Sequence, residues 1–192
     1  MIRAPKVPDS LVSAGDENRL VLFAGAGLSS GLVDVDNTIT FQRLPNWSQL
    51  VVDLLSRAHE EKQLSTGERR QLLAAIKQGK HLFASETVRQ RMGERLFKEV
   101  LRDIFRNPKL RPTVRHELIS DIPFSAIITT NYDKLIESAN TGVLPPTYTF
   151  DDGPQIISAL AKNQFFVLKA HGDIDQERVI LTERDYRDLV YR

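Results

Sequence analysis

The chain has 192 residues, a formal net charge of +1, 41% hydrophobic and 27% charged residues, and no cysteine; this composition is ordinary for one soluble globular domain. The balanced charge argues against nucleic acid or an anionic membrane as a partner, and the absence of cysteine excludes disulfides, thiolate catalysis and cysteine-ligated zinc. We expect a cytoplasmic protein, because the first residues lack the apolar stretch of a signal peptide and no apolar run approaches a membrane span.

The N-terminal part of the chain predicts a lead-in, a strand and a glycine-rich turn. Residues 1–18, with two prolines and small polar residues, are expected to be poorly ordered. Residues 19–24 contain an unbroken apolar run, which is typical of a buried parallel strand. Gly25 and Gly27 follow, and they favour either a tight strand-to-helix turn or a close approach of the backbone to a ligand. A helix starting there would direct N–H groups and its positive end at an anion, so the first hypothesis is a phosphate site.

A helical section follows the loop predicted for residues 33–45, in which Thr38–Phe41 is expected to form a short strand. Ser65 and Glu68 fit a capping box, and Gly79 fits a helix stop. Apolar residues recur at helical spacing in two stripes, which we interpret as core rather than as a cofactor site. The stripes consist of Trp47, Leu50, Val51, Leu54, Leu55 and Ala58, and of Leu96, Phe97, Val100, Leu101, Ile104 and Phe105.

Strands return in the last third of the chain. Phe124–Thr130 and Phe165–Gly172 are short apolar segments typical of buried strands, with predicted helices between them at Tyr132–Ala139 and Pro154–Lys162. This alternation predicts an α/β fold with a Rossmann-like, mostly parallel sheet. The helical block at about 47–120 is long for one crossover, so we interpret it as a helical subdomain inserted after the first strand.

Polar clusters follow each of the three predicted strands. The glycine-rich turn follows the first strand, Thr129–Asp133 (TTNYD) the second and Lys169–Asp173 (KAHGD) the third. Each cluster has a structural alternative, because Asn131 or Asp133 can cap the next helix and His171 can be a structural histidine. The carboxyl ends of parallel strands meet at one edge of a sheet, where ligands bind. Their joint placement therefore favours one shared crevice.

Together with Leu44–Trp47 (LPNW), the motifs GAGLS, TTNYD and HGD resemble those of the sirtuin-like (silent information regulator) domains, which bind NAD. The resemblance covers about residues 19–190 and assigns residues 19–192 to one sirtuin-like NAD-binding domain. The NAD-binding residues that it implies are Gly25, Ala26, Gly27, Ser29, Trp47 and Thr130. Trp47 would cover the nicotinamide end of NAD, and it can equally be a core anchor of its helix.

The resemblance also implies three catalytic residues. Asn131 would contact the nicotinamide ribose, Asp133 would face the nicotinamide amide and His171 would be the catalytic base. The bond between nicotinamide and ribose is glycosidic, and its cleavage passes through an oxocarbenium-like transition state. Nicotinamide departs neutral, so no general acid is needed. A histidine titrates near neutrality, which suits His171 to activate water or a ribose hydroxyl.

Departures from the family pattern define the expected reaction. Deacylases of the family usually carry four zinc-binding cysteines, and this chain has none, so we expect no metal and water as the acceptor. We therefore predict an NAD glycohydrolase that forms ADP-ribose and nicotinamide. Bacterial proteins that this chain resembles and that lack these cysteines often deplete NAD during defence against phage, so the resemblance implies the NAD-depleting effector of a bacterial antiphage defence system. Two alternatives are a nucleotide-sensing module that holds NAD or ADP-ribose without turnover, and a zinc-free protein deacylase.

The same resemblance carries expectations about the surroundings of the domain. No glycine–serine turn for the adenosine half of NAD precedes Arg192, so we expect the fold to be incomplete at its C-terminus. We expect a C-terminal sensor region or a separate activator protein, and an oligomer in the active state. Direct binding to nucleic acid or to a membrane is not expected.

Overall fold

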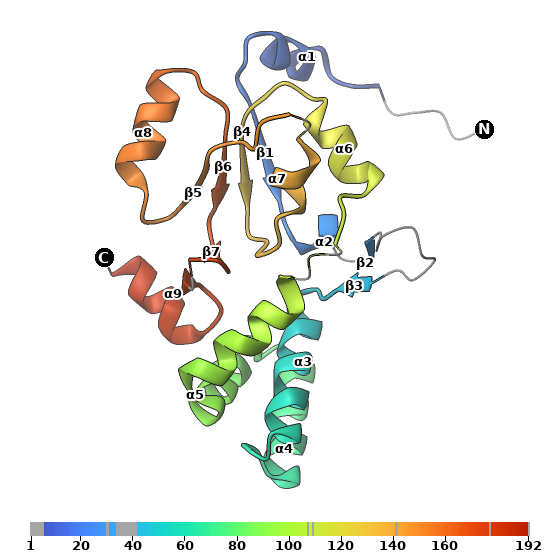
Figure 1. The fold of residues 1–192 in the computed structure, drawn as a ribbon, viewed down its shortest axis with the longest axis vertical. Coiled ribbons are helices and arrows are strands. Elements are labelled where there is room, and N and C mark those ends of the chain that lie inside the picture. The colour runs from blue at the N-terminus through green and yellow to red at the C-terminus, as the bar shows by residue number, and fades with distance from the viewer. Residues whose placement is uncertain are drawn as a thin grey trace, which may run out of the picture.

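A four-stranded parallel sheet with the strand order β1-β4-β6-β5 forms the centre of the fold (Figure 1). The computed structural model describes residues 6–29, 31–33, 42–106, 108, 110–140, 142–176 and 178–191. The strands of the sheet are β1 (Leu20–Ala24), β4 (Phe124–Thr129), β6 (Phe166–Lys169) and β5 (Thr147–Thr149). The predicted α/β fold with a parallel sheet is confirmed, and β5 is a strand that the sequence pattern did not indicate.

Helices cover both faces of the sheet, because successive residues of a buried strand point to opposite sides. On one face of β4, Ala126 packs against α8 (Gly153–Ala161). On the other face, Ile127 packs against α7 (Leu135–Ala139), and α6 (Val114–Ser120) contacts α7. The result is a three-layer arrangement, with α8 on one side of the strands and α6 and α7 on the other (Figure 1).

The register of the sheet brings the ends of its strands to one level. Ala24, Thr129 and Lys169 are aligned neighbours across β1, β4 and β6. The polar segments that follow these residues therefore begin side by side at one edge, as expected for parallel strands.

Three helices form a module beyond this edge of the sheet (Figure 1). They are α3 (Trp47–Glu60), α4 (Thr66–Lys77) and α5 (His81–Phe105). Their apolar stripes pack into one buried core, as predicted, with Leu54 and Leu101 fully buried in it. We call α3, α4 and α5 the helical module.

Local sequence signals define the ends of these helices. Ser65 accepts a hydrogen bond from the backbone N–H of Glu68, whose carboxylate accepts from the N–H of Ser65, so the predicted capping box is confirmed. Gly79 follows α4 with φ of +80°, a conformation that favours glycine. A second glycine of this kind, Gly93 with φ of +74°, breaks α5 into two helical parts.

The lead-in contains an element that the sequence reasoning missed. Residues 9–16 form α1 (Asp9–Asp16), so the expectation of a poorly ordered segment is wrong for them. Pro8 precedes this helix without a side-chain capping bond, which explains why no start signal was recognised. Gly15 allows α1 to pack closely against β1, because an added Cβ would lie only 3.2 Å from the side chain of Leu20.

Short elements complete the fold. Gly31–Val33 (β2) pairs antiparallel with Gln42–Leu44 (β3), and the strand predicted at Thr38–Phe41 lies outside the described residues. The segment predicted as one strand to Gly172 divides instead into β6 and a second strand. These later elements are β7 (Gly172–Asp173), β8 (Arg178–Val179) and α9 (Glu183–Val190). No helix within the described ranges is long and apolar enough to cross a membrane.

Candidate active site

A cavity of about 330 Å³ lies where the carboxyl ends of β1 and β4 face the helical module. The predicted site residues on its wall are Ala26, Ser29, Trp47, Thr130, Asn131, Asp133 and His171. The wall also includes Leu44, Pro45, Asn46, Leu50, Phe105, Tyr132 and Tyr186. Apolar side chains from the helical module thus enclose the polar residues that follow the strands, a mixture typical of small-molecule sites.

Gly25 and Gly27 lie beside this cavity rather than on its wall. Neither residue has a positive φ. An added Cβ at Gly25 would lie 3.7 Å from the Thr130 hydroxyl, and one at Gly27 would meet no described atom within 4 Å. The turn itself therefore does not require glycine at either position, which favours the alternative that a ligand approaches the backbone here.

The helix after β1 is shorter than the phosphate hypothesis assumed. It is α2 (Ala26–Ser29), a single turn of four residues. A macrodipole needs many aligned peptide units, so α2 cannot provide the strong positive end that a long helix has. Any anion held here would be bound by individual backbone N–H groups.

Asn131 is held in a buried hydrogen-bonded group at the base of the cavity. Its Nδ2 donates to the hydroxyl of Ser29 at 3.1 Å, and its backbone N–H donates to the Thr129 hydroxyl at 3.1 Å. Ser29 also lies 3.2 Å from Nε2 of His116, a residue of α6. The Oδ1 atom of Asn131 is buried and has no hydrogen-bond partner among the described residues. A buried acceptor without a partner is costly, and Asn131 lines the cavity, so a ligand group that reaches this atom would satisfy it.

His171 occupies the turn between β6 and β7. Its Nε2 lies 3.1 Å from the hydroxyl of Tyr186 in α9, and the two rings meet edge to face at 5.4 Å between centroids. Burial lowers the pKa of His171 below its usual value. The imidazole is therefore neutral near pH 7, the form that can accept a proton.

Asp133 has both a structural contact and a place on the cavity wall. Its Oδ1 accepts a hydrogen bond from the backbone N–H of Leu135, the first residue of α7, at 3.0 Å. This is the capping contact that we kept as the structural alternative, and it uses one of the two carboxylate oxygens. The other oxygen belongs to the same buried side chain, so a cap and a ligand contact are compatible.

Lys169 holds the loop that carries Asn131 and Asp133. Its Nζ donates to the carbonyl oxygens of Tyr132 at 3.2 Å and of Asp133 at 2.7 Å. Because Lys169 is fully buried, these bonds form in a low-dielectric interior where they are strong. The final residue of β6 thereby fixes the backbone that follows β4.

Two buried carboxylates balance the charge of Lys169. Glu137 lies 3.2 Å and Asp173 lies 3.5 Å from its Nζ. The Glu137 contact is an ion pair outside hydrogen-bond geometry, and no hydrogen bond reaches either carboxylate oxygen from the described residues. Burial raises the pKa of Glu137, and the attraction of Lys169 opposes that rise.

Trp47 lies both against the core and on the cavity wall. It is the first residue of α3, whose start is capped by Asn46 through a 2.9 Å hydrogen bond from the N–H of Gln49 to Oδ1. Its side chain packs against the core of the helical module and also lines the cavity. The sequence LPNW thus anchors a helix and shapes the site.

Comparison of the sequence with known proteins finds similarity to one family. The SIR2-like domain matches residues 125–192, the segment that carries Asn131, Asp133 and His171. "NAD(+) hydrolase ThsA" of Acinetobacter baumannii (strain 532279) is 29% identical over 183 residues, or 93% of this chain. "Defense-associated sirtuin 2" of Bacillus subtilis is 27% identical over 187 residues, or 92% of this chain. The chain is thus similar to the SIR2-like domain over residues 125–192 and to both relatives over most of its length. It spans 32% of the length of the first relative and 16% of the second.

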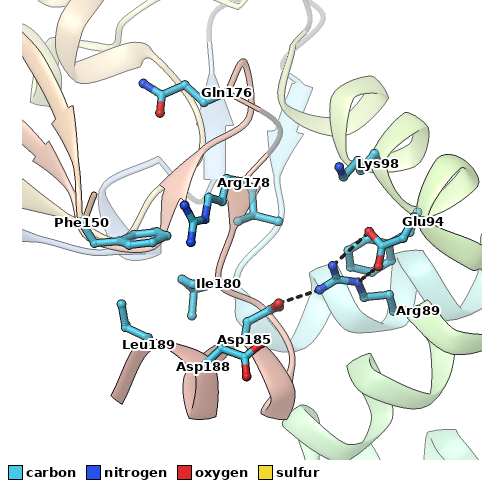
Figure 2. A pocket seen from close by; sticks show the side chains of 12 residues that line it. Arg89, Glu94, Lys98, Phe150, Gln176, Arg178, Ile180, Asp185, Asp188 and Leu189 are labelled. Atoms are coloured by element: carbon cyan, nitrogen blue, oxygen red, sulfur yellow. Dashed lines mark hydrogen bonds and ion pairs between the residues drawn. The ribbon is translucent and has the colours of Figure 1, made fainter. Parts of the chain in front are cut away.

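A second cavity, of about 490 Å³, lies between α5, β8 and α9 (Figure 2). Arg89 of α5 crosses it and donates to Glu94 at 2.7 and 3.0 Å and to Asp185 of α9 at 2.7 Å. On the opposite wall, the guanidinium of Arg178 lies over the ring of Phe150 at 5.0 Å from its centroid. Arg89 thus ties α9, and with it Tyr186, to the helical module.

Several residues of the candidate site were missed by sequence reasoning. Tyr186 lies on an unpredicted helix, and His116 lies on a short helix without a recognised motif. The apolar wall residues Leu50 and Phe105 were predicted, but as core. A signal for them existed in the helical stripes, whereas none marked Tyr186 or His116. Within the described segments, no three histidine, aspartate or glutamate side chains are placed to hold a metal ion, and the absence of zinc stays a prediction.

Proposed function

We propose that this SIR2-like chain is an NAD glycohydrolase, which cleaves the nicotinamide–ribose bond to give ADP-ribose and nicotinamide. One observation carries the proposal: Asn131, whose buried Oδ1 has no partner among the described residues, and the neutral imidazole of His171 line one cavity. The names of the two relatives, an NAD(+) hydrolase and a defence-associated sirtuin, support the same reaction and a role in antiphage defence.

In this proposal Asn131 orients the ribose of NAD. A ribose hydroxyl can donate to Oδ1 of Asn131, whose Nδ2 is already engaged by Ser29. The anchored amide would hold the ring while its bond to nicotinamide lengthens and positive charge develops on the sugar. Asp133 would meet the nicotinamide amide, and Trp47 would cover the same end of the ligand.

His171 would activate the water that attacks the ribose. The water gives one proton to the imidazole, its oxygen bonds to the anomeric carbon, and the bond to nicotinamide breaks with its electron pair going to the pyridine nitrogen. Nicotinamide leaves neutral, and the proton on His171 passes to solvent. Because burial lowers the pKa of His171, the base form is present at neutral pH.

The proposal extends to control of the activity. Both relatives are far longer than this chain, so further regions accompany the similar segment in those proteins. Unregulated NAD hydrolysis would exhaust the NAD of a cell. We therefore propose that a sensor region or activator protein gates the site in the cytoplasm and that the active form is oligomeric.

Nicotinamide release is the measurement that tests the proposed reaction. We expect the activated protein to release nicotinamide and ADP-ribose from NAD at the same rate with and without an acylated peptide. Asn131→Ala and His171→Ala should each lower the rate by about 100-fold or more, the usual cost of losing a positioned base or anchor. His81→Ala, which removes a half-buried histidine that bonds Ser48 outside the cavity, is the matched control and should leave the rate unchanged.

The alternatives predict different results in the same assay. Release that depends on the acylated peptide would indicate a deacylase. Binding of NAD without release, in the presence of activator, would indicate a sensing module. A rate near that of the parent protein for His171→Ala would remove this residue from the mechanism.

A further inference from the structure

His116 is a buried titratable residue that the proposed reaction does not use. It lies on α6 at 1% exposure, outside every motif of the sequence, and its Nε2 reaches the Ser29 hydroxyl at 3.2 Å. A buried polar side chain beside a cavity constrains its neighbours through the direction of its hydrogen bonds. That direction can be derived from the contacts of the other ring nitrogen.

The backbone N–H of Thr113 determines the tautomer of His116. This group can only donate, and it points at Nδ1 of His116 from 3.2 Å. Nδ1 must therefore be the acceptor, and the hydroxyl of Thr113, at 2.9 Å, faces the same lone pair. A neutral imidazole has one N–H, which is consequently on Nε2 and donates to Ser29.

Ser29 then has one remaining hydrogen-bonding group. Its oxygen accepts from His116 and from Nδ2 of Asn131, which uses both lone pairs. Its own proton is left for a further acceptor, and Ser29 lines the cavity. The Ser29 proton and the unpartnered Oδ1 of Asn131 thus present a donor and an acceptor next to each other.

We propose that His116 is a positioning residue that fixes this donor–acceptor pair for a sugar hydroxyl of the ligand. A hydroxyl both accepts and donates, so one ribose hydroxyl can take the Ser29 proton and donate to Asn131. The assignment of the sugar to the ribose of NAD rests on the proposed function. The direction of the hydrogen bonds from Thr113 through His116 to Ser29 does not rest on it.

The charges around His116 keep it in the form that this role needs. Burial lowers its pKa, the carboxylate of Asp133 acts in the opposite direction and the guanidinium of Arg115 lowers the pKa further. A second proton would place an N–H on Nδ1 against the N–H of Thr113. The neutral Nε2–H tautomer is therefore the one compatible with both neighbours.

Nitrogen-15 NMR of the histidine side chains tests the tautomer directly in the protein without ligand. We expect Nδ1 of His116 to resonate as an unprotonated ring nitrogen and Nε2 as a protonated one at neutral pH. A proton on Nδ1 would overturn the proposal whatever the protein does to NAD. The spectrum of His116→Gln, which lacks this residue, assigns the signals.

Kinetics of matched variants test the consequence for the ligand. His116→Leu fills the same space without a donor, and we expect kcat/KM for NAD to fall about 10-fold or more. His116→Gln keeps an N–H donor and should recover most of that loss. His59→Leu removes another histidine hydrogen bond, 2.9 Å from the carbonyl oxygen of Leu64 in the helical module, and should leave kcat/KM unchanged.

Two further results keep the test decisive. NAD analogues that lack the 2′ or the 3′ hydroxyl of the nicotinamide ribose should react poorly with the parent protein. For at least one of these analogues, the parent protein and His116→Leu should have the same kcat/KM. A merely structural role of His116 would not produce this result. Equal kcat/KM for parent and His116→Leu overturns the proposal. If the parent protein does not cleave NAD, the proposed function fails, and the NMR result alone decides the role of His116.

Discussion

Gly172, the glycine of the HGD motif, has φ of +84°, and an added Cβ would overlap the carbonyl oxygen of Arg178 in β8. The backbone conformation and the pairing with β8 require glycine here. Gly25 and Gly27 show the opposite situation, since neither the turn nor the described neighbours require a missing side chain.

Alanine substitutions at Gly27 and Gly172 should separate these two roles. Gly172→Ala combines a strained φ with a backbone clash, so we expect the free energy of unfolding to fall by about 2 kcal/mol or more. Gly27→Ala, in a helical turn with open space, should change stability by less than about 1 kcal/mol and in the favourable direction. Its effect should be on NAD, with weaker binding or slower nicotinamide release.

Urea unfolding and nicotinamide release on the same samples check both expectations. Gly67→Ala provides a control in α4, because an added Cβ there meets only the Ser65 hydroxyl, at 4.0 Å. Unimpaired NAD cleavage by Gly27→Ala would show that no ligand approaches this backbone. A fully stable Gly172→Ala would contradict the role given to β8.

At the scale of elements, the sequence was informative wherever the signal was local. The capping box at Ser65, the stop at Gly79 and the stripes of the helical module depend on residues within a few positions of each other. The helix α9 has no buried residue of its own and follows two-residue strands. Its place depends on a contact with α5, ninety-six positions away, through Arg89 and Asp185. Such a contact has no local pattern.

Arg89→Met should therefore loosen α9 while leaving the helical stripe intact. Arg89 bridges the two parts of α5 through Glu94 and reaches Asp185, and its guanidinium lies 5.3 Å from the centroid of the Phe97 ring. Glu94 is 60% exposed in its side chain and its pair with Arg89 contributes little, whereas Asp185 is 14% exposed, and a hydrogen bond to such a charged group typically contributes about 1 to 3 kcal/mol. We expect a loss of stability in that range and a lower rate of NAD cleavage, because Tyr186 would no longer be held against His171.

Arg95→Met on the same helix is the matched control. Arg95 is 84% exposed in its side chain and, among the described residues, pairs with Glu99 along the helix. Surface pairs of this type contribute little, so stability should change by less than about 0.5 kcal/mol. Thermal unfolding and nicotinamide release measure the effects of the two substitutions. Equal effects would show that the contacts of Arg89 drawn in Figure 2 do not position α9.

At the scale of the whole molecule, parallel topology explains why the polar part of the candidate site could be predicted. Once β1, β4 and β6 are recognised as parallel, their carboxyl ends must share an edge, and the residues after them must meet. Ser29, Asn131 and His171 reach one cavity for this reason. His116 approaches the same place from α6, whose position depends on how it packs against α7. The order of the strands therefore does not predict where His116 lies.

The burial of two histidines near this edge predicts how the stability of the whole domain depends on pH. Burial lowers the pKa of both His116 and His171. The unfolded chain takes up protons on them near pH 6.5, the usual value, whereas the folded protein resists protonation to lower pH. The unfolded state then binds more protons, so the free energy of unfolding falls as pH drops below about 6.5 and levels off below the folded pKa values.

Urea unfolding at about pH 7.5 and 5.5, on either side of the usual histidine pKa, measures this loss. His116→Gln and His171→Gln should each lose less stability between the two pH values than the parent protein, by up to about 1.4 kcal/mol per unit of pKa difference. The raised pKa of Glu137 has the opposite sign, because that carboxyl makes the folded state bind more protons than the unfolded state. Its contribution is common to all three proteins and cancels in the comparison. Equal losses in the parent and both variants would mean that the fold does not lower the pKa of either histidine.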